Sequence, residues 1–185
     1  MTGRTTTYAA LLRGINVGGS RKLPMAELRA LMGELGHGGV RTYLQSGQAV
    51  FTAERGDEES LAAELAGAIR ERFGFGVDVL VRDHAYLRGV REACPFPAER
   101  LEGKQLHATF FSVPVDEGRF ASVGREGFLP EDYRLGDRVL YLYAPEGLGR
   151  SKLAVALSSR RVVGDAVVTT RNWNTVRKLE AMTSA

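Results

Sequence analysis

The sequence predicts an α+β protein made of two tandem ferredoxin-like units, each with a β-α-β-β-α-β order and an antiparallel sheet, plus an extra C-terminal helix. The main observation is that runs with strand patterns and segments with helical periodicity follow one another in this order twice. The length of 185 residues suits two such units. A hydrophobic fraction of 44% and a charged fraction of 25% are ordinary for a chain with a buried core.

The first predicted unit covers residues 1–83. Its strands are short apolar or alternating runs bounded by turn residues: Tyr8–Arg13, Val40–Leu44, Ala49–Thr52 and Val77–Val81. Ser46-Gly47 indicates a hairpin between the middle two. One helix opens at Pro24, whose missing N–H is harmless in a first turn, and ends at Gly36. The second helix, Asp57–Phe73, carries an apolar stripe.

Residues 84–104 are expected to form a connecting helix and a turn at Pro95-Phe96-Pro97, and residues 105–185 the second unit. Its predicted strands are His107–Val113, a run near Asp132–Leu135, Val139–Tyr143 and Ala166–Thr170. Its predicted helices are Val115–Val123 and Ser151–Arg160. Apolar residues at three-residue steps predict the final helix: Trp173, Val176, Leu179 and Met182.

Several classes of protein are excluded by what the sequence lacks. No apolar run has the length of a membrane span and the N-terminus has no signal-peptide pattern, so we expect a cytoplasmic protein without a membrane partner. A single cysteine, Cys94, rules out a disulfide framework, and the three scattered histidines favour no metal site. Gly14–Ser20 lacks the lysine of a phosphate-binding P-loop, and no dinucleotide or serine-hydrolase motif occurs. No cofactor is expected.

Scarce residue types indicate where a site could lie. Of 25 basic residues 21 are arginine, which is typical of a GC-rich genome and weakens any argument from the net charge of +3 to nucleic acid. Against that background, all three asparagines and two of the four lysines fall within Arg13–Lys22 and Arg171–Lys178. These two windows are therefore the first candidates.

The glycine-rich loop Arg13–Lys22 joins a predicted strand to a predicted helix. Backbone N–H groups of such a loop can converge on an anion, with charge from Arg13, Arg21 and Lys22 and freedom of the backbone from Gly18 and Gly19. The alternative is a shaped turn in which Asn16 hydrogen-bonds its own backbone.

Two further segments follow the same logic. In Gly147–Leu153, Ser151 is a plausible helix N-cap, whereas Arg150 and Lys152 place positive charge at the unfavourable end, where an anion or water could compensate. In Thr169–Lys178, an asparagine caps the final helix and Trp173 either packs in the core or offers a stacking platform for a base. The remaining polar residues of this segment could reach a ligand: Arg171, Asn172, Asn174 and Lys178.

Several of these motifs resemble the bacterial domain of unknown function 1697 family. The similarity is carried by LLRGINVGG (Leu11–Gly19), Ser46-Gly47, GRSKL (Gly149–Leu153) and TRNWNTVRKL (Thr170–Leu179). The family usually has asparagine after Ser46-Gly47, and this chain has Gln48, an amide with one more methylene. The resemblance implies a two-part α+β fold of ferredoxin-like units and implies no activity.

Three functional interpretations follow. The preferred one is binding of an anionic ligand, namely a nucleotide, nucleic acid or phosphorylated metabolite, by Ser46 and the three segments, with Arg13–Lys22 and Arg171–Lys178 meeting in space and Arg150–Lys152 beside them. The second is an enzyme acting on a small substrate, for which no general base is evident beyond Glu27 or Asp165. In the third, the motifs only pack the two halves. The sequence predicts neither catalytic residues nor an oligomeric state.

Overall fold

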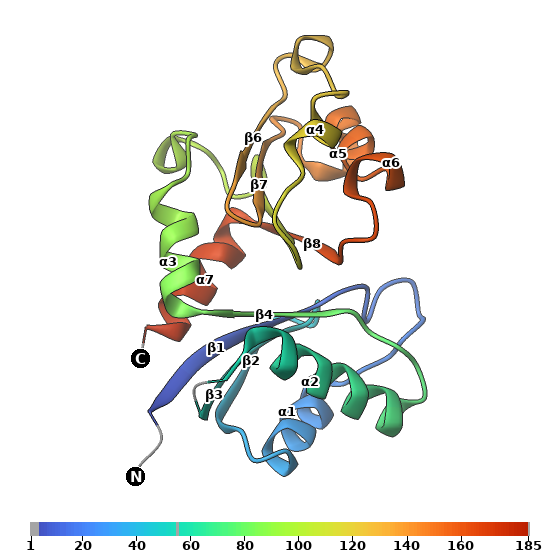
Figure 1. Ribbon diagram of the computed structural model, residues 1–185, viewed down its shortest axis with the longest axis vertical. Coiled ribbons are helices and arrows are strands. Elements are labelled where there is room, and N and C mark those ends of the chain that lie inside the picture. Colours follow the sequence, from blue (N-terminus) through green and yellow to red (C-terminus); the bar gives the residue numbers. More distant parts are fainter. Residues whose placement is uncertain (1–3, 55, 185) are drawn as a thin grey trace. The chain divides into compact units, whose positions relative to one another are not determined.

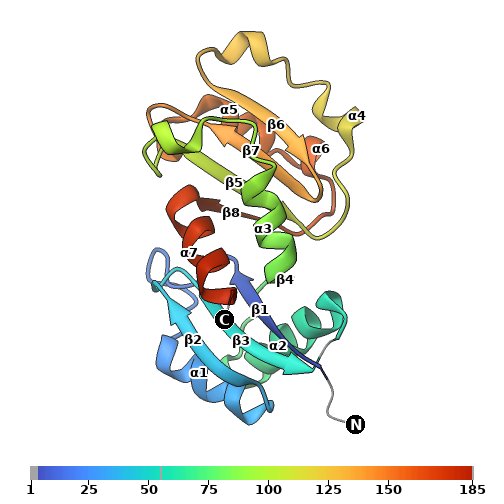
Figure 2. The same ribbon diagram turned by 90° about the vertical axis from the view of Figure 1, so that its left-hand side faces the viewer.

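The computed structural model describes residues 4–54 and 56–184, and the chain divides into two compact units (Figures 1 and 2). Unit 1 comprises Met1–Leu87 together with Leu179–Ala185, and unit 2 comprises Arg88–Lys178. Each unit holds one four-stranded antiparallel sheet. Among the described residues, no helix has the length and apolar character that crossing a bilayer requires.

Unit 1 has the split β-α-β-β-α-β arrangement, with strand order β2-β3-β1-β4. Its elements are β1 (Thr5–Leu12), α1 (Met25–Glu34), β2 (Gly38–Tyr43), β3 (Gln48–Glu54), α2 (Glu58–Phe73) and β4 (Val79–Asp83). Both helices cover the same face of the sheet (Figure 1). Alternating strand residues such as Leu12 and Phe51 meet the apolar stripes of the helices, including Leu28 and Ile69, in one core.

Unit 2 repeats this topology with strand order β6-β7-β5-β8. Its elements are η1 (Ala98–Arg100), β5 (Leu106–Phe111), α4 (Glu117–Phe120), η2 (Arg125–Phe128), β6 (Asp132–Gly136), β7 (Val139–Tyr143), η3 (Leu148–Arg150), α5 (Lys152–Leu157), α6 (Arg160–Val163) and β8 (Val168–Asn172). Phe111, Leu142 and Tyr133 of the sheet pack against Phe120 and Leu153 of the short helices. The predicted fold class is thereby confirmed.

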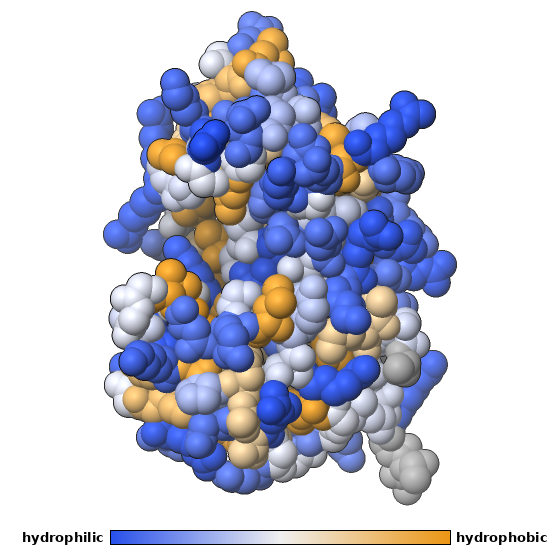
Figure 3. Space-filling view, turned by 180° about the vertical axis from the view of Figure 1, so that it is seen from behind, coloured by the Kyte–Doolittle hydropathy of each residue, from blue (hydrophilic) through white to orange (hydrophobic). Residues whose placement is uncertain are grey.

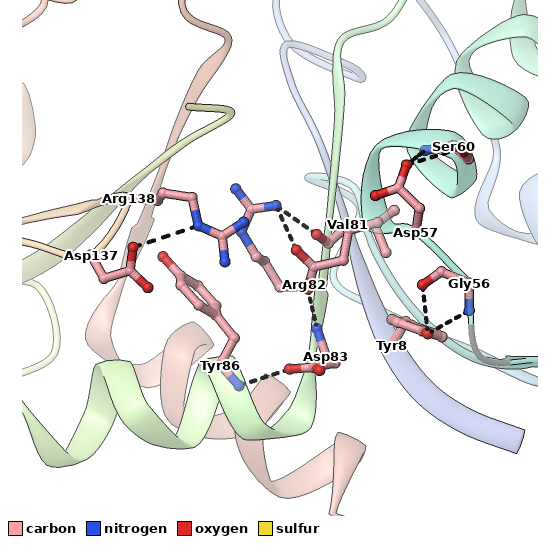
Figure 4. A network of polar contacts seen from close by, with 11 residues as sticks. Tyr8, Gly56, Asp57, Ser60, Val81, Arg82, Asp83, Tyr86, Asp137 and Arg138 are labelled. Carbon is pink, nitrogen blue, oxygen red and sulfur yellow. Dashed lines mark hydrogen bonds and ion pairs between the residues drawn. The ribbon is translucent and has the colours of Figure 1, made fainter. Parts of the chain in front are cut away.

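The last strand of each unit passes directly into a helix. β4 leads into α3 (His84–Glu92), and β8 into α7 (Trp173–Thr183). In α3, the carboxylate of Asp83 accepts a hydrogen bond from the Tyr86 backbone N–H at 2.8 Å (Figure 4). Asn172 caps α7 in the same way, through Thr175 N–H at 2.9 Å. The last strand of each unit thus ends in a side-chain N-cap of the helix that follows it.

Some predicted elements differ from the structure in their bounds. The helix expected over Ser151–Arg160 is two short helices, α5 and α6, separated by Ser158 and Ser159. The Ser158 hydroxyl donates to the Val155 carbonyl at 3.0 Å, and serine side chains that bond local carbonyls compete with helix continuation. The helix expected over Val115–Val123 is shorter, because only Glu117–Phe120 form α4. The strand expected at Ala166–Thr170 begins and ends two residues later, as β8 (Val168–Asn172).

Exposed large hydrophobic side chains among the described residues are few and dispersed. They are Val17, Leu44, Val113, Leu129, Leu148 and Val155. On the face shown in Figure 3, hydrophobic patches are separated by hydrophilic side chains. Separated apolar residues of this kind are normal for a protein surface, so the face in Figure 3 shows no broad apolar area that would mark a site.

Candidate functional site

The loop after β1 is held in place by the side chain of Asn16. Its amide nitrogen donates to the carbonyls of Leu23 and Gln45 at 2.9 and 2.8 Å, and its oxygen accepts from Leu23 N–H at 2.8 Å. Asn16 itself has a positive φ of 55°, a conformation that asparagine tolerates better than most residues. These contacts agree with the shaped-turn interpretation of Asn16, because both amide N–H groups are used by backbone carbonyls.

The same loop is anchored to the segments on both sides of it. Leu12 N–H donates to Gly47 O at 2.8 Å, and Arg13 N–H donates to Asp78 O at 3.0 Å. Gly47 has a φ of 96°, and a Cβ there would lie 2.8 Å from Cδ1 of Ile15, so the turn requires glycine. The loop is therefore fixed between the β2–β3 turn and the segment before β4.

Ser46 and Gln48 stabilise the β2–β3 turn. The buried amide of Gln48 donates to Tyr43 O at 2.8 Å and to the Ser46 hydroxyl at 3.3 Å. Gln48, which stands where the resembling family has asparagine, therefore uses its amide inside the turn. Ser46 is exposed at its surface.

A groove of about 400 Å³ lies beside the loop, on the side of α2. It is lined by Arg21, Ala66, Gly67, Arg70, Gly76, Val77 and Asp78. A Cβ added at Gly67 or Gly76 would meet nothing within 4 Å, so both glycines leave free space. Arg70 follows Gly67 by three residues and therefore lies on the same side of α2. The groove combines open backbone with two guanidinium groups.

Positive charge predominates around this groove. Arg13 forms an ion pair with Asp78 at 3.8 Å, with both side chains 54% exposed. Within the described ranges, the side chains of Arg21, Lys22 and Arg70 have no ion-pair or hydrogen-bond partner. Of these, Arg21 and Arg70 line the groove, and their mutual repulsion would fall if an anion bound between them.

The second predicted segment lies beside a carboxylate from another part of unit 2, that of Glu131. Ser151 is 4% exposed and caps α5 by accepting from Ala154 N–H at 2.8 Å. Its hydroxyl donates to one oxygen of the Glu131 carboxylate, and the other oxygen accepts from Lys152 N–H at 3.2 Å. Glu131 therefore places negative charge at the start of α5, where it is favourable, through contacts to the Ser151 hydroxyl and the Lys152 backbone rather than to the Lys152 ammonium. Arg150 also lies 4.0 Å from Glu146.

The third predicted segment is largely built into unit 2. Trp173 is 3% exposed, and its ring centroid lies 6.2 Å from that of Tyr141, which agrees with the packing interpretation. Arg171 donates to Thr169 Oγ1 at 2.6 Å and to Thr170 O at 3.0 Å, and burial lowers the pKa of its guanidinium to about 10. Asn174 and Lys178 are exposed.

Residues 103–104 bring the second and third segments into the same neighbourhood of unit 2. Gly103 O accepts from Trp173 N–H at 3.3 Å, and a Cβ at Gly103 would collide with the Asn174 side chain. Lys104 O lies 3.8 Å from the position of a Cβ on Gly147. The first segment belongs to unit 1, so its expected meeting with the third stays a prediction.

The two candidate general bases differ from the groove residues in position. Asp165 forms an ion pair with Arg160 at 3.3 Å, and its side chain is 93% exposed. Glu27 is exposed in the first turn of α1. Neither lines the groove beside the first loop.

The sequence interpretation missed Arg70, Gly67 and Asp78. A detectable signal existed, because a glycine in the middle of an amphipathic helix is costly for helix formation and invites a local reason. His107 has no neighbouring sequence motif that indicates a role. It is 5% exposed in β5, its Nδ1 has no partner among the described residues, and burial lowers its pKa to about 4.

Comparisons with known proteins support the fold and the family. A conserved bacterial protein from Streptococcus pneumoniae has a similar structure, with a TM-score of 0.76 and 24% sequence identity over 97% of this chain and 99% of that chain. A search of curated proteins found no significant match. The family described as a protein of unknown function (DUF1697) matches residues 5–141, a range that includes the first loop and ends before Gly149. Since this range covers most of the chain, the protein belongs to the DUF1697 family.

Proposed function

We propose that unit 1 binds a small phosphate-bearing ligand, a nucleotide or a phosphorylated metabolite, in the groove beside the first loop. The observation that carries this proposal is that two arginines line one groove, Arg21 and Arg70, and that neither side chain has an ion-pair or hydrogen-bond partner among the described residues. Guanidinium groups present fixed pairs of N–H donors that match phosphate oxygens. The volume of about 400 Å³ is in the range of small-molecule sites.

The glycines give the groove its access. Gly67 and Gly76 leave the backbone uncovered, so a phosphate can approach it closely. Asp78 lies in the same groove, where it pairs with Arg13, and its carboxylate would repel a phosphate placed beside it. The ligand oxygens are therefore expected between Arg21 and Arg70.

Binding of inorganic phosphate, pyrophosphate and adenosine 5′-monophosphate, measured by calorimetry, tests this proposal. Arg21→Ala and Arg70→Ala are each expected to weaken binding about tenfold or more, the effect of losing one charge-assisted hydrogen bond. Arg160→Ala is the matched control, because it removes the same charge from an arginine of unit 2 that is 89% exposed. Equal affinity in all variants would contradict the proposal.

Two other outcomes distinguish the alternatives. An oligonucleotide that binds with a steep salt dependence, more tightly than the mononucleotide, would indicate nucleic acid as the ligand. Gly67→Leu separates binding from packing, since it fills the groove and also favours helix formation by nearly 1 kcal/mol. Loss of binding with an unchanged or higher melting temperature is the expected result, and a loss of stability without any ligand would favour the packing role.

A further inference from the structure

Unit 2 contains a second cavity, of about 440 Å³, between the η2–β6 connection and the β7–α5 connection. Its walls are mostly apolar: Phe128, Leu129, Pro130, Ala144 and Pro145. Leu129 is 70% exposed, which is high for a large hydrophobic side chain and close to the 72% of Val155 on α5. A ligand that covered this side chain would gain about 25 cal/mol for each Å² of apolar surface removed from water.

The polar groups at the floor of the cavity satisfy one another. The Ser151 hydroxyl donates to Glu131 and accepts from Ala154 N–H, and Glu131 also accepts from Lys152 N–H. Ser151 is 4% exposed, so its hydroxyl is poorly placed to attack a ligand. Ser151 and Glu131 therefore need no hydrogen bond from a ligand. A ligand would be recognised by the apolar walls and by the charged residues at the rim.

Of the two cations that line the cavity, one has no ion pair among the described residues. Arg150 lies 4.0 Å from the Glu146 carboxylate, in a pair whose side chains are 81% and 76% exposed. The ammonium of Lys152 forms no ion pair with any residue in ranges 4–54 and 56–184. Glu131 and Glu146 line the same cavity and repel a ligand in proportion to its negative charge, so a single carboxylate paired with Lys152 is repelled less than a ligand with several charges.

We infer that this cavity binds a small monocarboxylate with a compact apolar body. The carboxylate pairs with the Lys152 ammonium, and the body lies against Leu129, Pro130 and Pro145. The site is separate from the groove of unit 1 in its residues and in the charge of its ligand. The observations behind it are the apolar walls, the hydrogen-bonded Ser151–Glu131 pair and the Lys152 ammonium, which has no ion pair among the described residues.

The test uses 3-phenylpropionate as the probe, with 3-phenylpropanol and 3-phenylpropylamine as ligands that keep the body and change the charge. Titration of the full chain by NMR is expected to give saturable binding of the carboxylate with a Kd below about 1 mM, and shifts at the Leu129 methyl groups. The affinity of the alcohol is expected to be at least about tenfold lower than that of the carboxylate, and the amine is expected to bind most weakly of the three. Absence of saturable binding would overturn the inference, as would equal binding of acid and alcohol.

Two variants identify the residues responsible. Lys152→Met keeps the length of the side chain and is expected to weaken 3-phenylpropionate at least tenfold while leaving the alcohol unchanged. Lys104→Met is the matched control, because Lys104 is 73% exposed and pairs with Glu102 at 3.0 Å outside the cavity wall. Leu129→Ser, at an exposed position, is expected to weaken acid and alcohol alike. If Lys152→Met and Lys104→Met behave identically, the assignment of Lys152 is wrong.

Discussion

The two glycine-rich basic loops of this protein look alike in sequence and differ in the structure. Beside the first, Arg13–Lys22, two arginines of the adjoining groove, Arg21 and Arg70, have no partner among the described residues. The second, Gly147–Lys152, receives the Glu131 carboxylate at the start of α5. A basic loop before a helix is thus not by itself a phosphate site, because a distant segment of the chain can place a carboxylate beside it.

The loops also occupy different places in the repeated topology. The first follows β1, the first strand of its unit, whereas the second follows β7, the third strand of its unit. Since neighbouring strands of each sheet are antiparallel, these connections leave opposite ends of equivalent sheets. The comparison therefore concerns two independently built loops on one scaffold.

The largest expected effect compares a glycine of the β2–β3 turn, which anchors the first loop through Leu12, with a glycine inside the second loop. Gly47→Ala would place a Cβ 2.8 Å from Ile15 at a φ of 96°, and we expect a loss of about 4 kcal/mol in the free energy of unfolding from overpacking and backbone strain. In the second loop, a Cβ at Gly149 meets nothing within 4 Å, so Gly149→Ala is expected to stay within about 0.5 kcal/mol. Urea denaturation of both variants measures the contrast, and comparable losses would refute it.

The next largest effect compares equivalent positions of the two central strands. Tyr8 pairs with Asp83, and His107 pairs with Asn172, so the two residues correspond. The Tyr8 hydroxyl hydrogen-bonds Gly56 (Figure 4), whereas the pKa of His107 is lowered from 6.5 to about 4 by burial.

The sign of the pH dependence follows from that shift. Above pH 6.5 the imidazole is neutral in both states, and between pH 6.5 and about 4 only the unfolded state binds the proton. The free energy of unfolding is therefore expected to fall by about 3 kcal/mol as the pH drops through this window. His107→Leu should reduce this fall when unfolding is measured at several pH values. An unchanged fall would assign it to other groups.

Asn16→Ala tests the anchoring of the first loop. It removes three hydrogen bonds to backbone groups, in a half-buried setting where water replaces part of them, and a loss of about 2 kcal/mol is expected. If the loop positions the groove, phosphate binding should also weaken in the folded variant at low temperature. A destabilised variant with full binding would show that the groove does not need this loop geometry.

The smallest expected effect concerns the internal anion of the second loop. Glu131→Gln keeps an acceptor and removes the charge beside Ser151 and Lys152, which should cost about 1 kcal/mol in thermal unfolding. Glu146→Gln is the control, because Glu146 pairs with Arg150 at 4.0 Å on the exposed surface. An exposed ion pair of this kind contributes about a few tenths of a kcal/mol to stability. Equal effects would mean that Glu131 is an ordinary surface charge.

The element order was predictable because periodicity and turn residues are local properties. Val139–Tyr143 matches β7 in its bounds, whereas the division between α5 and α6 depends on how Ser158 bonds the backbone. Side-chain partners distant in sequence were not predictable. Glu131 lies 20 residues before Ser151, and Arg70 reaches the groove of a loop that ends at Lys22 only through the packing of α2.

The duplicated strand-to-helix junction has a consequence for reading variation within the family. Arg82-Asp83 and Arg171-Asn172 occupy matching places, and the side chain before each cap donates to the preceding carbonyl, at 2.7 Å to Val81 and 3.0 Å to Thr170. Matching positions of the two units can therefore be compared within the sequence of each relative. A position kept alike in both halves reflects the shared scaffold, and a position that one half alone preserves among relatives marks a task that only that half performs.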